Sequence, residues 1–219
     1  MLTYAVGDIH GCLDLLAELL GLIEADAAGR ERRLICLGDY IDRGPDSAGV
    51  IARLRGLQDA EPDRVICLKG NHEDLMLRAI RRPDVLPVWL RNGGDAALDS
   101  FGCDEPAEIP ADVLAWVAAC PTYWEDERRG FVHAGLRPGR DRLDQSDRDR
   151  LWIREEFLEA NYDFGKLVVH GHTPRLNGRP ELWPYRVNLD TGAVFGGRLT
   201  AGVFADDEAR PVGFIQVPS

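Results

Sequence analysis

The chain has 219 residues, with 26 basic and 37 acidic side chains and a formal net charge of −11. This length suits one domain with a sizeable core, and the negative charge disfavours broad contact with nucleic acid or an anionic membrane. No stretch has the length and apolarity of a membrane span and the first residues do not resemble a secretion signal, so a cytoplasmic protein is expected.

Three short apolar runs in the first part of the chain predict buried strands: LTYAV (2–6), RRLICL (32–37) and DRVICL (63–68). Each leads, directly or after one residue, to a glycine and then a potential ligand, at Asp8, Asp39 and Asn71. Helical patterns fill the intervals, at 12–25, at 47–57 and after residue 71. The alternation predicts an α/β domain whose strands bring their carboxyl ends to one edge, where open α/β sheets bind ligands.

The region 83–130 differs from this pattern, because it reads as helices joined by loops and has no metal-ligand spacing. We expect a mainly helical, cap-like insertion within a single domain that spans residues 1–219. The segment NGGDAAL (92–98) lacks the lysine and the glycine spacing of the common phosphate-binding loops. A turn at the start of a helix is its expected role, and a loop near the substrate is the alternative.

All five histidines follow predicted strands, a placement that a set of unrelated core histidines would not show. They are His10, His72, His133, His170 and His172. Two of the later strands, in GFVHAG (130–135) and KLVVHGHTP (166–174), end directly in histidines, and the tail from 186 to 217 predicts successive antiparallel strands. Aspartate, asparagine and histidine without thiolates are ligands that suit Mn²⁺, Fe or Zn²⁺.

Five short motifs occur in a fixed order along the chain: GDIHG, GDYIDRG, GNHE, HAG and GHT. Together they resemble the signature of the calcineurin-like metallophosphoesterases, and especially the phosphoprotein phosphatase branch with its bacterial and phage serine/threonine phosphatases. The resemblance extends from residue 7 to about residue 173. It implies a four-layer α/β/β/α sandwich with two mixed sheets and a dinuclear, metal-dependent phosphoesterase.

The same resemblance implies two divalent metal ions, with Mn²⁺ as the leading choice and Fe or Zn²⁺ as alternatives. Asp39 is the expected bridging ligand, and a hydroxide shared by the two metals is the expected nucleophile. The implied ligands of one metal are Asp8, His10 and Asp39, and those of the other are Asp39, Asn71, His133 and His172.

The remaining motif residues receive separate roles from the resemblance. His72 is the expected general acid, with Asp42 orienting its imidazole, and Arg43 is expected to hold the phosphate. The segment LWIREEF resembles a Trp-x-Arg segment of phage-type bacterial enzymes, which makes Arg154 a second phosphate ligand. The alternative for Arg154 is a surface arginine paired with an adjacent glutamate.

Two positions remain open from the sequence. Lys69 stands where many eukaryotic members have arginine, and we leave it out of the site. His170 and His172 would share a face of an extended strand, and the Gly-His-Thr match favours His172 as the ligand.

The leading functional prediction is hydrolysis of phosphomonoesters, as a serine/threonine phosphoprotein phosphatase acting on a phosphoprotein or a small phosphoester. The first alternative is a hydrolase of diadenosine tetraphosphate or another dinucleoside polyphosphate. Asp42 and the GNHE motif favour the phosphatase, because symmetrical diadenosine tetraphosphatases typically lack that aspartate and have GNHD. A catalytically silent metal-binding scaffold is the third reading, and it would not need His72, Asp42 and Arg43.

Overall fold

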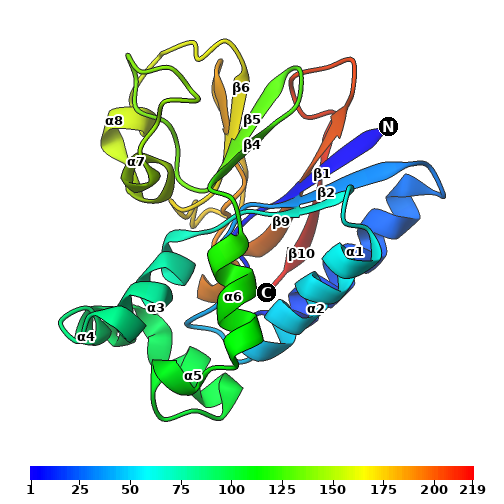
Figure 1. Ribbon diagram of the computed structural model, residues 1–219. Coiled ribbons are helices and arrows are strands. Elements are labelled where there is room, and N and C mark those ends of the chain that lie inside the picture. The colour runs from blue at the N-terminus through cyan, green and yellow to red at the C-terminus, as the bar shows by residue number, and fades with distance from the viewer.

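Two five-stranded sheets lie face to face at the centre of the molecule, and the computed structural model describes all 219 residues (Figure 1). The first sheet has the strand order β10-β9-β1-β2-β3, and the second has the order β4-β5-β6-β8-β7. Each sheet is mixed, with three parallel strands and antiparallel strands beside them. The strands are β1 (Leu2–Val6), β2 (Arg32–Cys36), β3 (Val65–Cys67), β4 (Tyr123–Glu125), β5 (Arg129–Val132), β6 (Leu167–His170), β7 (Glu181–Leu182), β8 (Arg186–Asn188), β9 (Arg198–Ala205) and β10 (Gly213–Pro218).

Strand periodicity divides the core into layers. Successive side chains of a strand point to opposite faces, so Tyr4 and Val6 of β1 pack toward the helices while Ala5 packs between the sheets. The layer between the sheets also contains Ile35 of β2 and Phe131 of β5. A smaller cluster joins the second sheet to two short helices, which completes the predicted four-layer α/β/β/α arrangement.

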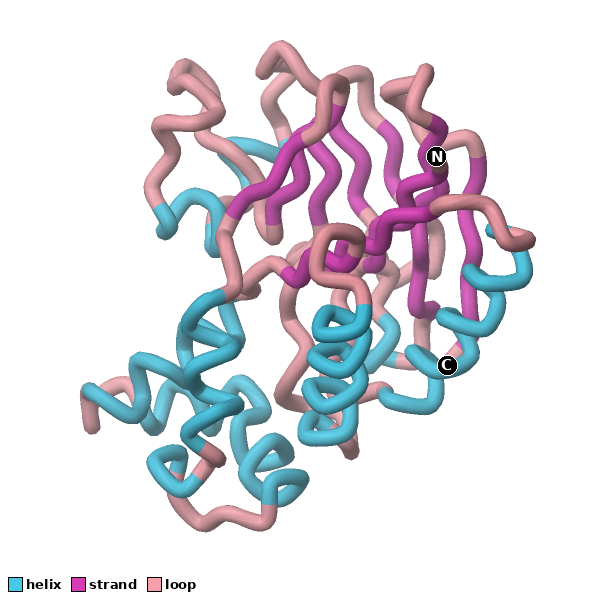
Figure 2. Tube along the Cα trace, turned by 45° about the vertical axis from the view of Figure 1, so that its right-hand side comes forward, coloured by secondary structure: helices cyan, strands magenta, loops and turns pink.

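Helices cover the outer face of the first sheet, as Figure 2 shows. Helix α2 begins as its sequence predicted, because the Asp46 carboxylate caps it by accepting a hydrogen bond from the Gly49 amide. No helix of the protein is both long and apolar enough to span a membrane. The helices are α1 (Leu13–Ala27), α2 (Ser47–Ala60), α3 (Asn71–Arg81), α4 (Leu86–Trp89), α5 (Asp95–Phe101), α6 (Ala111–Ala119), α7 (Asp147–Trp152) and α8 (Glu155–Leu158).

The region 83–130 contains helices α4, α5 and α6 and also the strand β4. The sequence predicted helices joined by loops throughout this region, but α6 ends at Ala119, and Pro121 two residues later cannot continue a helix. Residues Tyr123–Glu125 then pair with β5 at the edge of the second sheet. Between α4 and α5, residues Leu90–Gly94 form a π-type turn, so NGGDAAL leads into a helix.

Candidate active site

The predicted site residues follow the carboxyl ends of parallel strands in both sheets. Asp8 and His10 follow β1, Asp39 follows β2, and His133 follows β5. The same edge receives Asn71 and His72 after β3 and His172 after β6. Because the two sheets pack face to face, these loops meet: Oδ1 of Asn71 lies 2.8 Å from Nε2 of His133 and 2.7 Å from Nδ1 of His172.

Backbone strain is concentrated in these loops. Six non-glycine residues have positive φ, and five of them are predicted site residues: His10, Asp39, Asp42, Arg43 and His172. The sixth, Ala28, ends a helix. Such φ values are disfavoured for side chains with a Cβ atom and collect at sites where the surrounding structure imposes them.

Asp39 lies at the centre of the site, with one carboxylate oxygen facing each half. Its Oδ2 atom lies 3.5 Å from Nε2 of His10 and 3.8 Å from Nε2 of His72. Its Oδ1 atom lies 3.4 Å from Nε2 of His133. Two groups of possible ligands therefore share Asp39: His10 with His72, and His133 with His172. Burial would raise the pKa of Asp39, but the surrounding imidazoles lower it well below its usual value.

The surroundings of His133 test whether these residues fit a metal ion. Its Nδ1 atom lies 3.0 Å from the Leu37 carbonyl, which can only accept, so Nδ1 carries the proton. Burial lowers the pKa of His133, so the ring is neutral and Nε2 presents a lone pair. That lone pair faces Oδ1 of Asn71 at 2.8 Å and Oδ1 of Asp39 at 3.4 Å, which are also acceptors. A cation between the three atoms removes the repulsion, and the mixed N and O donors suit Mn²⁺, Fe or Zn²⁺.

His10 is held in the same way on the other side of Asp39. Its Nδ1 atom lies 2.8 Å from the Ile41 carbonyl, and burial lowers its pKa to about 3. The Nε2 lone pair therefore points toward the centre of the site, where in this structure it accepts a hydrogen bond from Nη1 of Arg43 at 2.6 Å. Nδ1 of His172 lies 2.7 Å from Oδ1 of Asn71, and its Nε2 atom is buried without a hydrogen-bond partner. These arrangements also fit divalent metal binding.

Asp8 lies slightly apart from the two groups, beside a carboxylate that the sequence analysis missed. The Asp8 carboxylate accepts a hydrogen bond from the His172 amide at 3.1 Å. Asp190, two residues after β8, is buried next to it, and burial together with the charges of Asp190 and Asp39 raises the pKa of Asp8 well above its usual value. Asp190 lies in NLDTG, and the available signal was a carboxylate placed just after a short apolar run, as at Asp8 and Asp39.

His72 is paired with Asp42, as the sequence predicted, and a third residue completes the group. Nδ1 of His72 lies 2.6 Å from Oδ2 of Asp42, and Trp89 donates its indole N–H to both Asp42 oxygens at 3.1 and 2.9 Å. Burial lowers the pKa of His72, but the charge of Asp39 and the bond to Asp42 outweigh it, so the pKa is raised. Trp89 comes from α4, within the predicted cap-like insertion.

Glu73 is a second residue that the sequence analysis quoted without assigning a role. Its carboxylate is fully buried and accepts hydrogen bonds from the amides of Asp39 at 2.9 Å, Tyr40 at 2.8 Å and Gly70 at 2.8 Å. The last residue of GNHE therefore fixes the loop that carries Asp39.

Arg43 reaches the site from the same loop. Its Nη1 atom lies 2.6 Å from Nε2 of His10, and its guanidinium lies 5.3 Å from the centre of the exposed Phe195 ring. The Arg43 amide donates to the carbonyl of Gly93 in the turn after α4. The segment NGGDAAL thus supports the loop that carries Arg43.

Arg154 and His170 occupy different surroundings. Arg154 is exposed at the start of α8, and its side chain has no ion pair or hydrogen bond, so the alternative pairing with a glutamate is not observed. Arg154 lines a surface cavity together with Trp152, whose ring lies 6.2 Å from the ring of His172, and its charge lowers the pKa values of His133 and His172. His170 is buried against Phe157, 5.0 Å between ring centres, and is not part of either ligand group.

Comparisons with known proteins identify a matching family and several relatives. A family model described as calcineurin-like phosphoesterase matches residues 1–199. Serine/threonine-protein phosphatase 1 of Salmonella typhimurium is 32% identical over 207 residues, which cover 90% of this chain and 89% of the relative. The asymmetrical bis(5'-nucleosyl)-tetraphosphatase PrpE of Halalkalibacterium halodurans is 29% identical, covering 98% of this chain and 92% of the relative.

Solved structures share the fold. A metallophosphoesterase from Sphaerobacter thermophilus superposes with a TM-score of 0.61 at 19% identity, covering 99% of this chain and 88% of that one. A mutant cold-active protein tyrosine phosphatase superposes with a TM-score of 0.70 at 19% identity, covering 98% of this chain and 77% of that one. At these identities the likeness concerns the fold alone.

Proposed function

This chain belongs to the calcineurin-like phosphoesterase family, and from that premise we propose that it hydrolyses phosphomonoesters, with phosphoserine and phosphothreonine proteins as substrates. The observation that carries the proposal is the buried group of His72, Asp42 and Trp89 beside Asp39. A serine or threonine oxygen leaves as a strongly basic alkoxide unless it is protonated. A positioned acid therefore has its greatest value for such esters.

In this proposal the chain's own residues perform three tasks. Asp8, His10, Asp39, Asn71, His133 and His172 hold two divalent metal ions, and the bound ions neutralise phosphoryl charge and lower the pKa of water. Arg43 and Arg154 bind and orient the phosphoryl oxygens through their planar guanidinium groups.

His72 holds the proton that the leaving oxygen takes. Its Nδ1 side is occupied by Asp42, so the proton is transferred from Nε2, on the side of the ring that faces Asp39. Asp42 keeps the ring oriented and favours its charged form. The hydrogen bond from the Trp89 indole holds the Asp42 carboxylate in place. Asp42 and Trp89 act through His72 and are positioning residues.

The second candidate is hydrolysis of a dinucleoside polyphosphate. It is supported by the relatives named asymmetrical tetraphosphatases, which this chain matches over nearly its whole length. A nucleotide leaves as a stabilised phosphate anion, so this reaction would depend less on the acid at His72.

The test compares kcat/KM for a phosphoserine peptide, a phosphotyrosine peptide and diadenosine tetraphosphate, each with Mn²⁺, Fe²⁺ and Zn²⁺. The proposal expects the phosphoserine peptide to be preferred. A preference for diadenosine tetraphosphate would contradict the phosphoprotein proposal and favour the second candidate. An Asp39→Asn preparation purified in parallel controls for contaminating phosphatases.

A further inference from the structure

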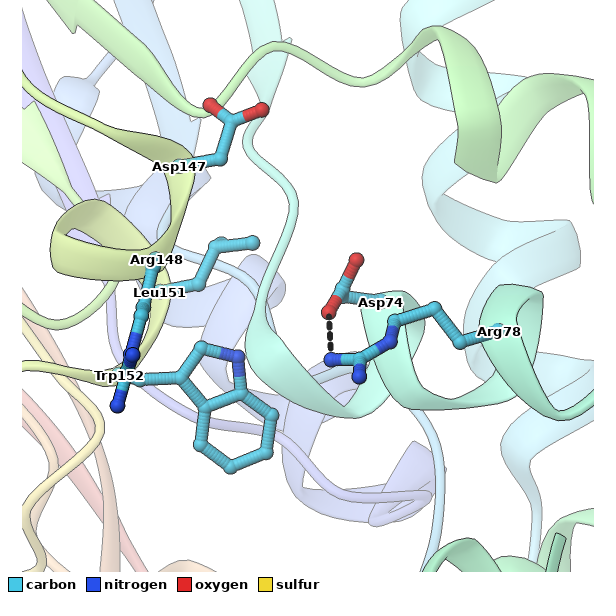
Figure 3. A pocket seen from close by; sticks show the side chains of 6 residues that line it. All are labelled: Asp74, Arg78, Asp147, Arg148, Leu151 and Trp152. Atoms are coloured by element: carbon cyan, nitrogen blue, oxygen red, sulfur yellow. Dashed lines mark hydrogen bonds and ion pairs between the residues drawn. The ribbon is translucent and has the colours of Figure 1, made fainter. Parts of the chain in front are cut away.

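Two surface cavities adjoin the candidate active site, one on each side of Trp152. One cavity, of about 560 Å³, lies between α3 and α7, and in Figure 3 the Trp152 indole faces Asp74 and Arg78 across it. The other, of about 750 Å³, is lined by four arginines: Arg137, Arg140, Arg148 and Arg154. In a chain with a net charge of −11, so many arginines around one cavity are unexpected.

The arginine-lined cavity lies close to the reacting centre. Trp152 lines this cavity, and its ring lies 6.2 Å, centre to centre, from the ring of His172. Arg154 lines the same cavity, beside Trp152. A substrate whose phosphate lies at the metal-binding residues can therefore extend past Trp152 into this cavity.

The charge of the cavity is only partly compensated. Arg137 is paired with Asp149 at 2.7 Å and with Glu156 at 3.1 Å. The side chains of Arg140, Arg148 and Arg154 make no ion pair and no hydrogen bond within the protein. The lining contains four arginines and three carboxylates, Asp149, Glu155 and Glu156, so the cavity keeps an excess of one positive charge.

The backbone around the cavity is fixed before any ligand binds. The buried Gln145 accepts a hydrogen bond from the Arg137 amide and donates to the carbonyls of Arg137 and Arg140, which closes the loop that carries Arg140. Ser146 caps α7 by accepting from the Asp149 amide, which fixes the helical turn that carries Arg148. The loop and the helix thus hold the arginine backbones in place, which lowers the ordering cost of binding an anion.

We propose that this cavity binds an acidic group near the phosphorylated residue of a protein substrate, so that the enzyme prefers acidic phosphopeptides. The inference rests on the phosphoprotein phosphatase function proposed above and adds a sequence preference to it. The recognised group is an anionic side chain, either a carboxylate or a second phosphate. Exposed arginines bind both, and their planar donors match both geometries.

The test uses two phosphoserine peptides that differ only in the residues flanking the phosphoserine, three aspartates in one and three asparagines in the other. A third peptide carries a second phosphoserine in place of one aspartate and separates the two sources of charge. The variant is Arg140→Gln with Arg148→Gln, which leaves Arg43 and Arg154 intact. The matched control is Arg53→Gln, because Arg53 is also exposed and unpaired but lies on α2, away from α7 and α8 (Figure 1).

Wild-type enzyme and the Arg53→Gln control should show a higher kcat/KM for the acidic peptides, and added salt should reduce the preference. Each arginine lost should reduce it by roughly 1.5- to 5-fold, the range for exposed ion pairs. Hydrolysis of p-nitrophenyl phosphate should be the same in all three proteins. Equal kcat/KM for acidic and neutral peptides in the wild type, or an unchanged preference in the double variant, would overturn the inference alone.

Failure of the underlying function gives a different result. If p-nitrophenyl phosphate is hydrolysed but neither peptide is, the phosphoprotein assignment fails and this inference falls with it. If diadenosine tetraphosphate is the preferred substrate and the double variant loses activity on it, the cavity binds a polyphosphate chain, and the peptide assignment is wrong.

Discussion

Asp39 offers one carboxylate oxygen to each half of the candidate site, and this arrangement leads to the first prediction. Asp39→Asn should nearly abolish turnover and remove much of the bound metal, because an amide supplies one oxygen without charge. The fold should persist, since the hydrogen bond that the backbone amide of Asp39 donates to Glu73 does not involve the substituted side chain. Metal analysis and circular dichroism of the purified variant check this, and full metal content with normal activity would contradict the assignment.

The pair formed by His72 and Asp42 leads to the second prediction, which concerns the leaving group. His72→Asn should reduce kcat for a phosphoserine peptide by roughly 10²- to 10⁴-fold, the usual contribution of general acid catalysis. The loss on p-nitrophenyl phosphate should be smaller, because nitrophenolate is already a stable anion.

Asp42→Asn should also reduce kcat more for the phosphoserine peptide than for p-nitrophenyl phosphate, but by smaller factors than His72→Asn, because the imidazole remains. The measurement is kcat for both substrates at saturating metal, with single-turnover data to establish that chemistry is rate-limiting. Equal losses on the two substrates would mean that His72 positions phosphate or metal, and the acid role would be withdrawn.

At the scale of elements, Glu73 joins the start of α3 to the loop after β2. Glu73→Gln should lower the free energy of unfolding by roughly 1–3 kcal/mol, because the new amide group turns N–H donors toward backbone N–H groups. Urea denaturation measures the loss. Asp74→Asn, in a part-exposed pair on the same helix, is the control and should change stability by less than about 0.5 kcal/mol. Similar values for both variants would contradict the proposed role.

Glu125 ties β4 to the arginine-bearing loop through Arg142 and to the segment before β6 through Lys166. The hydrogen bond from Arg142 is the main cause that lowers the pKa of Glu125 to about 2. A lowered carboxyl pKa stabilises the fold above the unfolded value, and this contribution is lost as the pH falls toward 2. Because the pair is partly solvated, Glu125→Gln should cost at most about 1 kcal/mol at pH 7. The difference from wild type in urea denaturation should shrink between pH 4.5 and pH 3, and a constant difference would count against the ion pair.

The sequence predicted the elements that carry local patterns and missed the contacts made across them. The strands before Asp8, Asp39 and Asn71 were predictable, because apolar runs ending in glycine are a local signal. The role of Trp89 was not predictable, because Trp89 contacts Asp42 from 47 positions away along the chain and no sequence periodicity indicates such a contact. Strand order was unpredictable for the same reason: β1 pairs with β9, near the other end of the chain.

At the scale of the whole molecule, the candidate ligands come from both sheets, so bound metal should hold the sheets together. Removing metal with a chelator should lower the thermal midpoint, and Mn²⁺ should restore it. At a hundredfold excess over its dissociation constant, one bound ion adds about 2.7 kcal/mol, or roughly 5–10 °C for a chain of this size. Asp39→Asn should show little of this response. If removing the metal from metal-loaded wild-type protein leaves the thermal midpoint unchanged, the arrangement is contradicted.

At the five site residues with positive φ, the backbone strain lowers the stability of the fold while the side chain serves the proposed catalysis. Arg43 shows this most clearly, because it is exposed and glycine there would relieve the backbone strain without leaving a buried void. Such relief is worth on the order of 1 kcal/mol, and the same change removes the guanidinium proposed to bind phosphate. An engineering campaign that selected this protein only for thermal resistance would therefore tend to replace Arg43 and erode catalysis, so position 43 should be held fixed in any such library.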